Sequence, residues 1–284
     1  MKTTIQLLTL LGGGTKRMLR GLVPAVTMVF LPTVVQASLS SVDLGTADGF
    51  AVLAGSGITV AGAVNTTTIT GDIGTFPTTS ITGLGNVTQT GVNHAGDAVT
   101  QQAKNDLITA YNDAAGRTPV TTVVSDTLGS LFLSSGVYGG GALDLTGTLT
   151  LDAQGNPDAI WIFQAASTLI TASSSKVVII NGGQACHVFW QVGSSATLGT
   201  DTDFIGNILA LTSITANTGA TVDGRLLALN GAVTLDENTI TESICNNSSA
   251  AVPEPTTLIV GALLLLPLGV NTLRKLREPR VDAP

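Results

Sequence analysis

Residues 196–244 read ATLGTDTDFIGNILALTSITANTGATVDGRLLALNGAVTLDENTITESI and contain the same order of short segments more than twice. Each repeat of about 18 residues holds a threonine-bearing segment, a second alternating segment and a wholly apolar one, and related segments begin upstream at Ser167. A strand-like repeat of this length is typical of a solenoid, in which each turn buries its apolar edge against the next turn. The repeat predicts a mainly β chain that coils into a three-sided β-solenoid.

Three segments near the N-terminus imitate the parts of this repeat. Residues 50–55 (FAVLAG), 58–63 (ITVAGA) and 67–72 (TTITGD) resemble its third, first and second segments respectively. The last repeat, at 233–244, has no third segment of its own. We therefore expect the N-terminal strands to complete the stack beside the C-terminal turns, out of sequence order.

One segment, residues 94–115, has a helical rather than a strand-like pattern. Asn93 is a suitable N-cap and Gly116 a suitable stop. The apolar residues at helical spacing are Ala95, Val99, Ala103, Leu107, Tyr111 and Ala114. The third segments of the repeat are apolar on both pleat faces, as in strands that are covered on both sides. We expect the helix to lie along the face that these segments form, which leaves two faces open to water.

The two ends of the chain carry the features of export and sorting signals. Residues 1–37 combine basic side chains with an apolar stretch and end on a small-x-small cleavage site, as a signal peptide does. Near the C-terminus, Pro253-Glu254-Pro255 precedes the uncharged residues 256–273 and a basic cluster. At about 1.5 Å per residue, this uncharged segment just spans a bilayer core as a helix. The sequence is thus divided into a signal peptide, a solenoid domain at 38–251 and a sorting tail at 252–284.

This tail resembles the PEP-CTERM sorting signal of Gram-negative and related bacteria. The resemblance implies export, transient inner-membrane anchoring through residues 256–273 and removal of the tail by an exosortase-type protease. The protein would then reach the cell surface or the extracellular matrix, where exopolysaccharide is a potential partner. A plain membrane anchor is the other interpretation of the same residues.

The body between residues 38 and 252 carries an excess of negative charge. It contains 16 acidic and four basic residues. This balance argues against nucleic acid and anionic membrane surfaces as partners. With so few charges, much of the surface must consist of Thr, Ser, Asn, Gly and small apolar side chains.

The two cysteines, Cys186 and Cys245, belong to a chain with export features, in which a disulfide is permitted. Both follow a second-segment strand, but three turns at about 4.8 Å each would separate them by roughly 14 Å. Bridged Cα atoms lie within about 7 Å of each other. A bridge would require the loop at 182–186 and the chain end to lean together, so the bridged and the free state both stay open.

Motifs for catalysis are missing from the sequence, which has no Gly-x-Ser-x-Gly, Cys-x-x-Cys or phosphate-loop pattern. Aromatic residues make up only 4% of the chain and cluster in the third segments, which favours core packing over a sugar-cleaving site. We therefore expect no enzymatic activity, no cofactor and no metal site.

Several longer strings resemble the ice-binding (antifreeze) domain family of bacteria, fungi and microalgae, over nearly all of residues 43–243. They are FAVLAGSGITV (50–60), TITGDIG (68–74), HAGDAVTQQAKNDLITAYNDAAGR (94–117), LTLDAQGNPDAIWIFQ (149–164), CHVFWQVGSSATLG (186–199) and FIGNILALTSIT (204–215). The resemblance implies a right-handed, discontinuous three-sided β-solenoid with one long helix packed alongside. It also implies an ice-binding face and no enzymatic activity.

Threonines of the first segments would form a ladder when the turns stack, and their β-branched side chains have few χ1 options. The predicted ice-binding residues are Thr168, Thr171, Thr197, Thr200, Thr215, Thr218 and Thr234. Some relatives carry a Thr-Ala/Gly-x-Thr/Asn motif on the ice-binding face, which residues 215–218 (TANT) match. Residues 234–237 (TLDE) depart from it by placing two carboxylates there.

The second segments offer another candidate face. Its outward threonines would be Thr148, Thr150, Thr221, Thr239 and Thr241, interrupted by Asp152, Asp223 and Arg225. Charged groups hydrate like ions and disturb an ordered water layer, so the first segments are preferred. The sequence thus predicts an extracellular ice-binding protein whose partner is the ice crystal surface. The alternative is a structural, adhesive matrix protein associated with exopolysaccharide and without ice activity.

Overall fold

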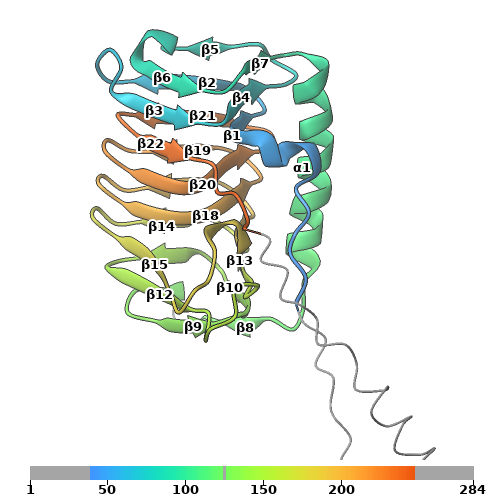
Figure 1. The fold of residues 1–284 in the computed structure, drawn as a ribbon, viewed down its shortest axis with the longest axis vertical. Helices are drawn as coiled ribbons and strands as arrows, with labels where there is room; N and C mark the ends of the chain where they lie inside the picture. The colour runs from blue at the N-terminus through green and yellow to red at the C-terminus, as the bar shows by residue number, and fades with distance from the viewer. Residues whose placement is uncertain (1–38, 124–125, 247–284) are drawn as a thin grey trace, which may run out of the picture. The chain divides into compact units, whose positions relative to one another are not determined.

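A computed structural model describes residues 39–123 and 126–246 of the 284-residue chain (Figure 1). The helices are η1 (Gly45–Gly49), η2 (Leu84–Asn86), α1 (Ala98–Gly116) and η4 (Ala185–His187). The strands before α1 are β1 (Phe50–Ala54), β2 (Gly57–Ala61), β3 (Thr67–Thr70), β4 (Asp72–Thr75), β5 (Ile81–Thr82), β6 (Val87–Thr90) and β7 (Asn93–Ala95). The strands after α1 are β8 (Thr121–Thr122), β9 (Phe132–Ser134), β10 (Gly136–Gly140), β11 (Leu143–Leu145), β12 (Thr148–Asp152), β13 (Trp161–Ala165), β14 (Leu169–Thr171), β15 (Lys176–Ile180), β16 (Val188–Val192), β17 (Ala196–Leu198), β18 (Asp203–Ala210), β19 (Ile214–Ala216), β20 (Thr221–Ala228), β21 (Ala232–Asp236) and β22 (Thr239–Thr241).

The strands stack in parallel into three faces, because successive turns of the chain follow nearly the same path. The first face is a seven-stranded sheet in the order β11-β14-β17-β19-β21-β2-β5. A fifteen-stranded sheet bends around a corner and forms the other two faces. The second face runs through β12, β15, β18, β20, β22, β3 and β6, and the third face through β10, β13, β16, β18, β20, β1 and β4. The predicted mainly β solenoid is confirmed.

Two glycines allow β18 and β20 to turn the corner between the second and third faces. Gly206 and Gly224 are neighbours in the ladder, with φ angles of 114° and 150° that residues with a Cβ rarely adopt. A Cβ atom on Gly224 would lie 2.0 Å from the backbone oxygen of Gly206. Glycine is therefore required where these strands bend past each other.

The N-terminal strands complete the stack out of sequence order, as predicted. β1 pairs with β20, β2 with β21 and β3 with β22, all in parallel. The chain continues to β7 at one end of the coil, and α1 then runs back to β8 at the other end (Figure 1). The helix thus returns the chain to the far end of the coil. From there the remaining strands stack turn by turn until β21 and β22 pair with β2 and β3.

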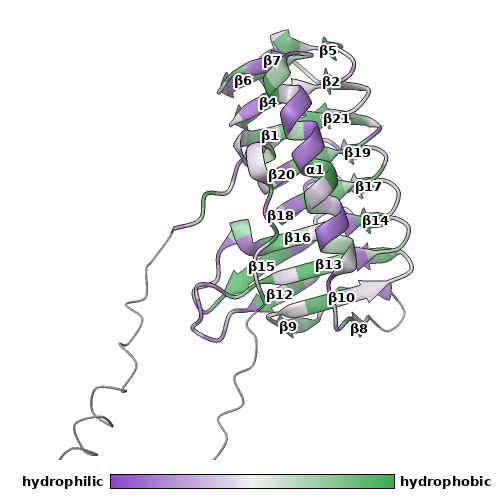
Figure 2. Cartoon of the chain, turned by 90° about the vertical axis from the view of Figure 1, so that its right-hand side faces the viewer, coloured by the Kyte–Doolittle hydropathy of each residue, from purple (hydrophilic) through white to green (hydrophobic). Residues whose placement is uncertain are grey.

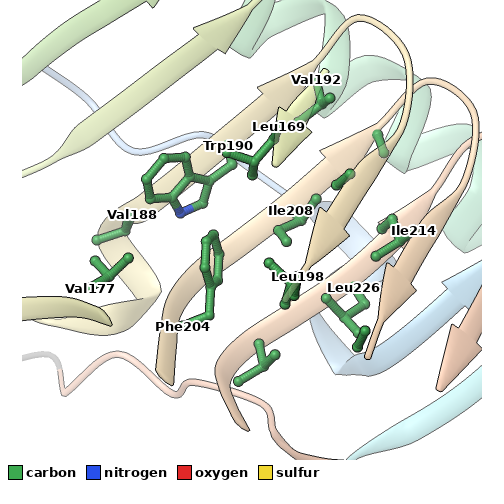
Figure 3. Close-up of a cluster of buried hydrophobic side chains, with 14 of the residues drawn as sticks. Leu169, Val177, Val188, Trp190, Val192, Leu198, Phe204, Ile208, Ile214 and Leu226 are labelled. Carbon is green, nitrogen blue, oxygen red and sulfur yellow. The ribbon is translucent and has the colours of Figure 1, made fainter. Parts of the chain in front are cut away.

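Inward-facing side chains fill the coil with a continuous apolar core, part of which is drawn in Figure 3. Trp190 stacks on Phe163 with ring centroids 4.0 Å apart and tilts against Phe204 at 5.0 Å. The indole N–H groups of Trp161 and Trp190 each donate to a backbone oxygen at 3.0 Å. These large side chains therefore pack without leaving a buried donor unpaired.

Helix α1 covers the third face, as predicted (Figure 2). Its buried side chains, among them Leu107, pack against outward residues of the strands beneath. These strand residues are Leu53, Ile162, Phe189, Leu209 and Leu227. Because the third-face strands are apolar on both sides, they need this cover, whereas the first and second faces alternate and do not.

The start of the helix differs from the prediction. Residues 93–95 form β7, which pairs with β4, and the helix begins only at Ala98. Asp97, rather than Asn93, is the N-cap, and its carboxylate accepts a hydrogen bond from the Thr100 backbone N–H at 2.8 Å. Strand pairing satisfies the backbone of residues 93–95, so it prevails over the helical pattern there.

The buried stripe of the helix also differs in part from the prediction. Val99 is exposed, whereas Lys104 is buried and donates from Nζ to the backbone oxygens of Ala228, at 2.6 Å, and Leu229. The apolar spacing used to predict the buried face of the helix could not identify Lys104, because its side chain is charged. Lys104 nevertheless binds the helix to the end of β20.

Arg225 does not interrupt the second face, in contrast to the prediction, because β20 has already turned the corner at Gly224. Arg225 as a whole residue is 1% exposed, and its guanidinium forms an ion pair with Asp48 at 2.8 Å. It also donates to Asn207 Oδ1 at 2.9 Å and to the Ser243 backbone oxygen at 3.0 Å. The arginine therefore joins three segments of the chain inside this corner.

The structure places a disulfide between Cys186 and Cys245, with Cα atoms 5.5 Å apart. The separation estimated from turn counting was too large, because the segment after β22 runs back along the stack. Asn246 N–H there donates to Gln184 Oε1 at 2.7 Å.

Within residues 39–123 and 126–246, no helix is long and apolar enough to cross a bilayer. The predicted signal peptide (1–37), the sorting motif (Pro253, Glu254 and Pro255) and the segment 256–273 lie outside the described residues.

Replacing Leu107 tests the contact between helix and coil. Leu107 is 0% exposed, so Leu107→Ala should lower the free energy of unfolding by about 2–5 kcal/mol in urea titrations. The neighbouring Ile108 is 48% exposed on the same helix, and Ile108→Ala should change it by no more than about 0.5 kcal/mol. Equal effects of the two substitutions would contradict the observed packing.

Because of Lys104, the free energy of unfolding should depend on pH in the alkaline range. Burial lowers the pKa of its amine from 10.5 to about 8. The unfolded chain therefore binds more protons than the folded protein between these values, and the free energy of unfolding should rise with pH across this window. Urea titrations near pH 7.5 and pH 10 should show a gain on the order of 1–3 kcal/mol that is absent from Lys104→Met. The same gain in the variant would refute this assignment.

Candidate functional site

The first face carries an in-register column of outward threonines. Its members, in stack order, are Thr197, Thr215, Thr234, Thr59 and Thr82. They come from β17, β19, β21, β2 and β5, so consecutive hydroxyls repeat at about the strand spacing of 4.8 Å. We call this set the threonine column.

Four threonines of the column, all except Thr82, have buried apolar side chains on both sides. These residues are Ala196, Leu198, Ile214, Ala216, Val233, Leu235, Ile58 and Val60. Because the side chains of a strand alternate between faces, burial of these neighbours fixes each threonine outward. The column is therefore a rigid feature of the fold.

The hydroxyl groups of the column are largely free to bind water. Thr82 Oγ1 lies 3.3 Å from Thr59 Oγ1. Within the described part of the chain, the hydroxyls of Thr197, Thr215 and Thr234 have no protein partner. The column thus presents a methyl group and a hydroxyl group at each step.

The structure places the predicted Thr168 beside the column rather than in it. Leu169 pairs with Ala196, so Thr168 aligns with Ser195 and Ile170 occupies the position next to Thr197. Asp144 is in register with Ile170 on the next strand, so the threonine column stops at Thr197. Thr168 therefore lies two residues before the position of its strand that stacks on Thr197.

Thr171 does not belong to the surface. It is 3% exposed, its hydroxyl lies 2.8 Å from that of Thr202, and it accepts a hydrogen bond from the Gly199 backbone N–H at 2.8 Å. The side chain points inward because it is in register with Leu145. The prediction that Thr171 faces ice is thus replaced by a structural role at the corner.

The predicted Thr200 and Thr218 lie in the exposed turns between the first and second faces. Thr218 Oγ1 donates to the carboxylate of Asp236 in the next turn of the coil. Glu237 accepts from the Ala63 backbone N–H at 3.4 Å in the same corner. The carboxylates of residues 234–237 therefore lie along the edge of the first face, and not in the column.

Thr59 and Thr82 were not among the predicted site residues. They come from N-terminal strands, whose place in the stack depends on pairing with β21. The likeness of residues 58–63 to the first segments was the signal that could have included Thr59. Thr82 lies in a strand of two residues with no detectable repeat pattern.

The threonines predicted on the second face lie at two separate places. Thr221, Thr239 and Thr241 are exposed and stand close together on β20 and β22. Thr148 and Thr150 lie on β12, beyond β15 and β18. Asp152 is on β12 as well, where the Asn181 side chain lowers its pKa by donating a hydrogen bond.

Two titratable groups away from the threonine column have raised pKa values. Burial raises the pKa of Asp223, and burial likewise raises that of Glu242, which the nearby Arg225 opposes. Cys186, His187 and Cys245 lie close together, but the two thiols are joined in the disulfide and offer no thiolate to a metal. The threonine column is therefore the strongest candidate site within the described residues.

A parallel β-solenoid with a flat column of threonines is suited to binding a repetitive surface rather than to a reaction at one point. The chain belongs to the family described as Ice-binding-like, whose model matches residues 52–241. It is 47% identical over 216 residues to an ice-binding protein of Nostoc sp. (strain HG1), covering 75% of this chain and 79% of the relative. It is 37% identical over 227 residues to one of Colwellia sp., covering 75% and 88%.

A similar structure is known. The crystal structure of an ice-binding protein from an Antarctic biological consortium matches with a TM-score of 0.71 at 45% identity, over 74% of this chain and 94% of that chain. The predicted family and fold are confirmed.

Substituting valine separates the structural threonine from the surface threonines. Thr171→Val leaves the Gly199 N–H without its buried partner and removes one of the two contacts of the Thr202 hydroxyl. It should lower the free energy of unfolding by about 1–3 kcal/mol. Thr197→Val, in the column, should change it by no more than about 0.5 kcal/mol. Thermal and urea unfolding of both variants provide the measurement. A larger effect at Thr197 would show that the two roles are exchanged.

Proposed function

We propose that this protein binds ice through its first face and thereby limits the growth or recrystallisation of ice. The observation that carries the proposal is the in-register column of Thr197, Thr215, Thr234, Thr59 and Thr82 on a flat sheet. Similarity to named ice-binding proteins, at 47% identity in the Nostoc relative, supports it.

The physical reason lies in preorganisation. Stacked β-branched side chains hold their methyl and hydroxyl groups at fixed, repeated positions, and so hold surface water in a regular array. The entropy of ordering these groups is lost when the chain folds and not when it adsorbs. Each group contributes little, but many in register on one plane make adsorption effectively irreversible. Ice must then bulge between adsorbed molecules, which lowers its local freezing point.

The proposed site consists of the threonine column and its small polar neighbours. Thr168, Ser195 and Ser213 line one side of the column, and the turn residues Thr200 and Thr218 line the other. These neighbours are short, so they keep the face level. Thr171 is left out because it is buried. This binding role requires no catalytic group and no cofactor.

We also propose that residues 1–37 direct export and that 252–284 act as a sorting tail, leaving 38–251 as the ice-binding domain. The Pro253-Glu254-Pro255 motif before an uncharged segment supports an exosortase-type protease and transient membrane anchoring as steps on this route. The destination would be the cell surface or the extracellular matrix. The same motif favours the alternative role of a structural matrix protein held in exopolysaccharide.

Replacing Thr215 tests the ice-binding role. Thr215 lies within the column, so the bulk of Thr215→Tyr should lift the face from the ice and strongly reduce both thermal hysteresis and inhibition of recrystallisation. The matched control is Thr109→Tyr, on the exposed side of α1, which should behave as the unchanged protein. Circular dichroism and thermal unfolding establish that both variants are folded.

The two candidate functions differ in this assay. If the unchanged protein has no effect on ice at high concentration, the matrix role replaces the ice-binding role. If the protein is active and Thr215→Tyr keeps full activity, the first face is not the site.

A further inference from the structure

The second face carries a larger threonine array than the first. Four neighbouring strands, in the order β6-β3-β22-β20, contribute outward threonines in two columns. One column consists of Thr88, Thr68, Thr239 and Thr221, and the other of Thr90, Thr70 and Thr241. We call these seven residues the threonine grid. Four of them lie on β3 and β6, so they join the others only through the out-of-order stacking.

The grid repeats in two directions. Neighbouring strands set a spacing of about 4.8 Å along the stack, and alternate residues of one strand set about 6.7 Å across it. The threonine column of the first face has the first spacing, but its flanking positions on β21 and β2 hold Ala232, Asp236, Gly57 and Ala61 in place of a second row of threonines. The grid therefore fixes positions on a plane, where the column fixes them on a line.

Every side chain of the grid is exposed. Thr221 Oγ1 donates to Asp203 Oδ1 at 3.0 Å, at the margin of the grid. Among the described residues, the hydroxyls of the other six have no protein partner. Their hydrogen-bonding capacity is thus left to water or to a surface that binds from outside.

The grid rests on a rigid support. Between the two columns, Ile69 and Ile240 are 0% exposed and Val222 is 2% exposed. These buried residues hold β3, β22 and β20 against the core, so the threonines above them keep one level. An array that is exposed, held by buried neighbours and unpaired at six of its seven hydroxyls meets the same physical requirements as the proposed ice-binding face.

The limits of the grid are also defined. On the next strand, Asp203 is in register with Thr221, and its carboxylate pairs with Lys176 at 2.5 Å. Asp223 occupies the position beside Thr241. Beyond them the face is hollowed by a cavity of about 430 Å³, lined in part by Val178 and Ile205. The flat, uncharged area therefore ends at β20.

We infer that the threonine grid is a second ice-binding face, which engages a different crystal plane from the threonine column. This inference rests on the proposed function. Turn residues and the carboxylates of Asp236 and Glu237 lie along the corner between the two faces. The column and the grid are therefore separate surfaces, and their different spacings match different sets of water positions in ice.

The test uses fluorescently labelled protein frozen slowly onto a single-crystal ice hemisphere, where the labelled zones reveal which crystal planes are bound. The unchanged protein should label two sets of planes. Thr239→Tyr, in the centre of the grid, should lose one set and keep the other, and Thr215→Tyr should do the reverse. The double variant should label neither. Thr70→Tyr is a second probe of the grid, used if Thr239→Tyr fails to fold.

Thr148→Tyr provides the matched control, because Thr148 is exposed on the same face but lies beyond Lys176 and Asp203. It should give the pattern of the unchanged protein. If folded Thr239→Tyr and Thr70→Tyr also give that pattern, the inference is wrong while the first-face proposal stands. If Thr239→Tyr labels no plane and Thr215→Tyr has no effect, the grid is the sole face and the first-face proposal is wrong. If the unchanged protein labels no plane, both fail together.

Discussion

In-register parallel stacking is the constraint on which the rest of this structure depends. Each strand forms backbone hydrogen bonds with the strands on either side of it in the stack. Every second side chain is buried in the core. A slip of one residue would expose a buried set of side chains, so the apolar interior fixes the register. The outward columns follow from this register. Ile214, Val233 and Ile58, buried beneath the first face, therefore determine where Thr215, Thr234 and Thr59 stand.

The placement of charge follows the same geometry. An acidic chain could easily place carboxylates among its threonines, yet Asp236 lies at the corner of the first face and accepts a hydrogen bond from Thr218. Asp203 is paired with Lys176 at the margin of the threonine grid. Arg225 is buried after the corner glycine, where it pairs with Asp48 of η1. Charged groups thus lie at the margins of the two threonine surfaces and not between their threonines.

The sequence predicts the fold well because the repeat carries two signals at once, alternation within a strand and recurrence between turns. It predicts the out-of-order stacking because residues 50–72 imitate the segment types that the last repeat lacks. It fails where tertiary contacts override a local pattern. Pairing with β4 makes residues 93–95 a strand although their pattern is helical. Thr171 was misplaced for another reason, because the alternation within β14 buries it together with Leu169. The positions of Thr82, Thr88 and Thr90 could not be read from the repeat, because β5 and β6 are short and irregular and only pairing places them.

The discontinuous order of the strands explains how broad threonine surfaces arise from a chain whose repeats are few. The C-terminal turns alone would supply three threonines to the column and three to the grid. The N-terminal strands raise these numbers to five and seven. This extension requires the chain to return along the coil, and α1 provides the return path while it seals the apolar third face. The helix thus packs on the third face, and it carries the chain from the N-terminal strands to the far end of the coil, where the remaining turns begin.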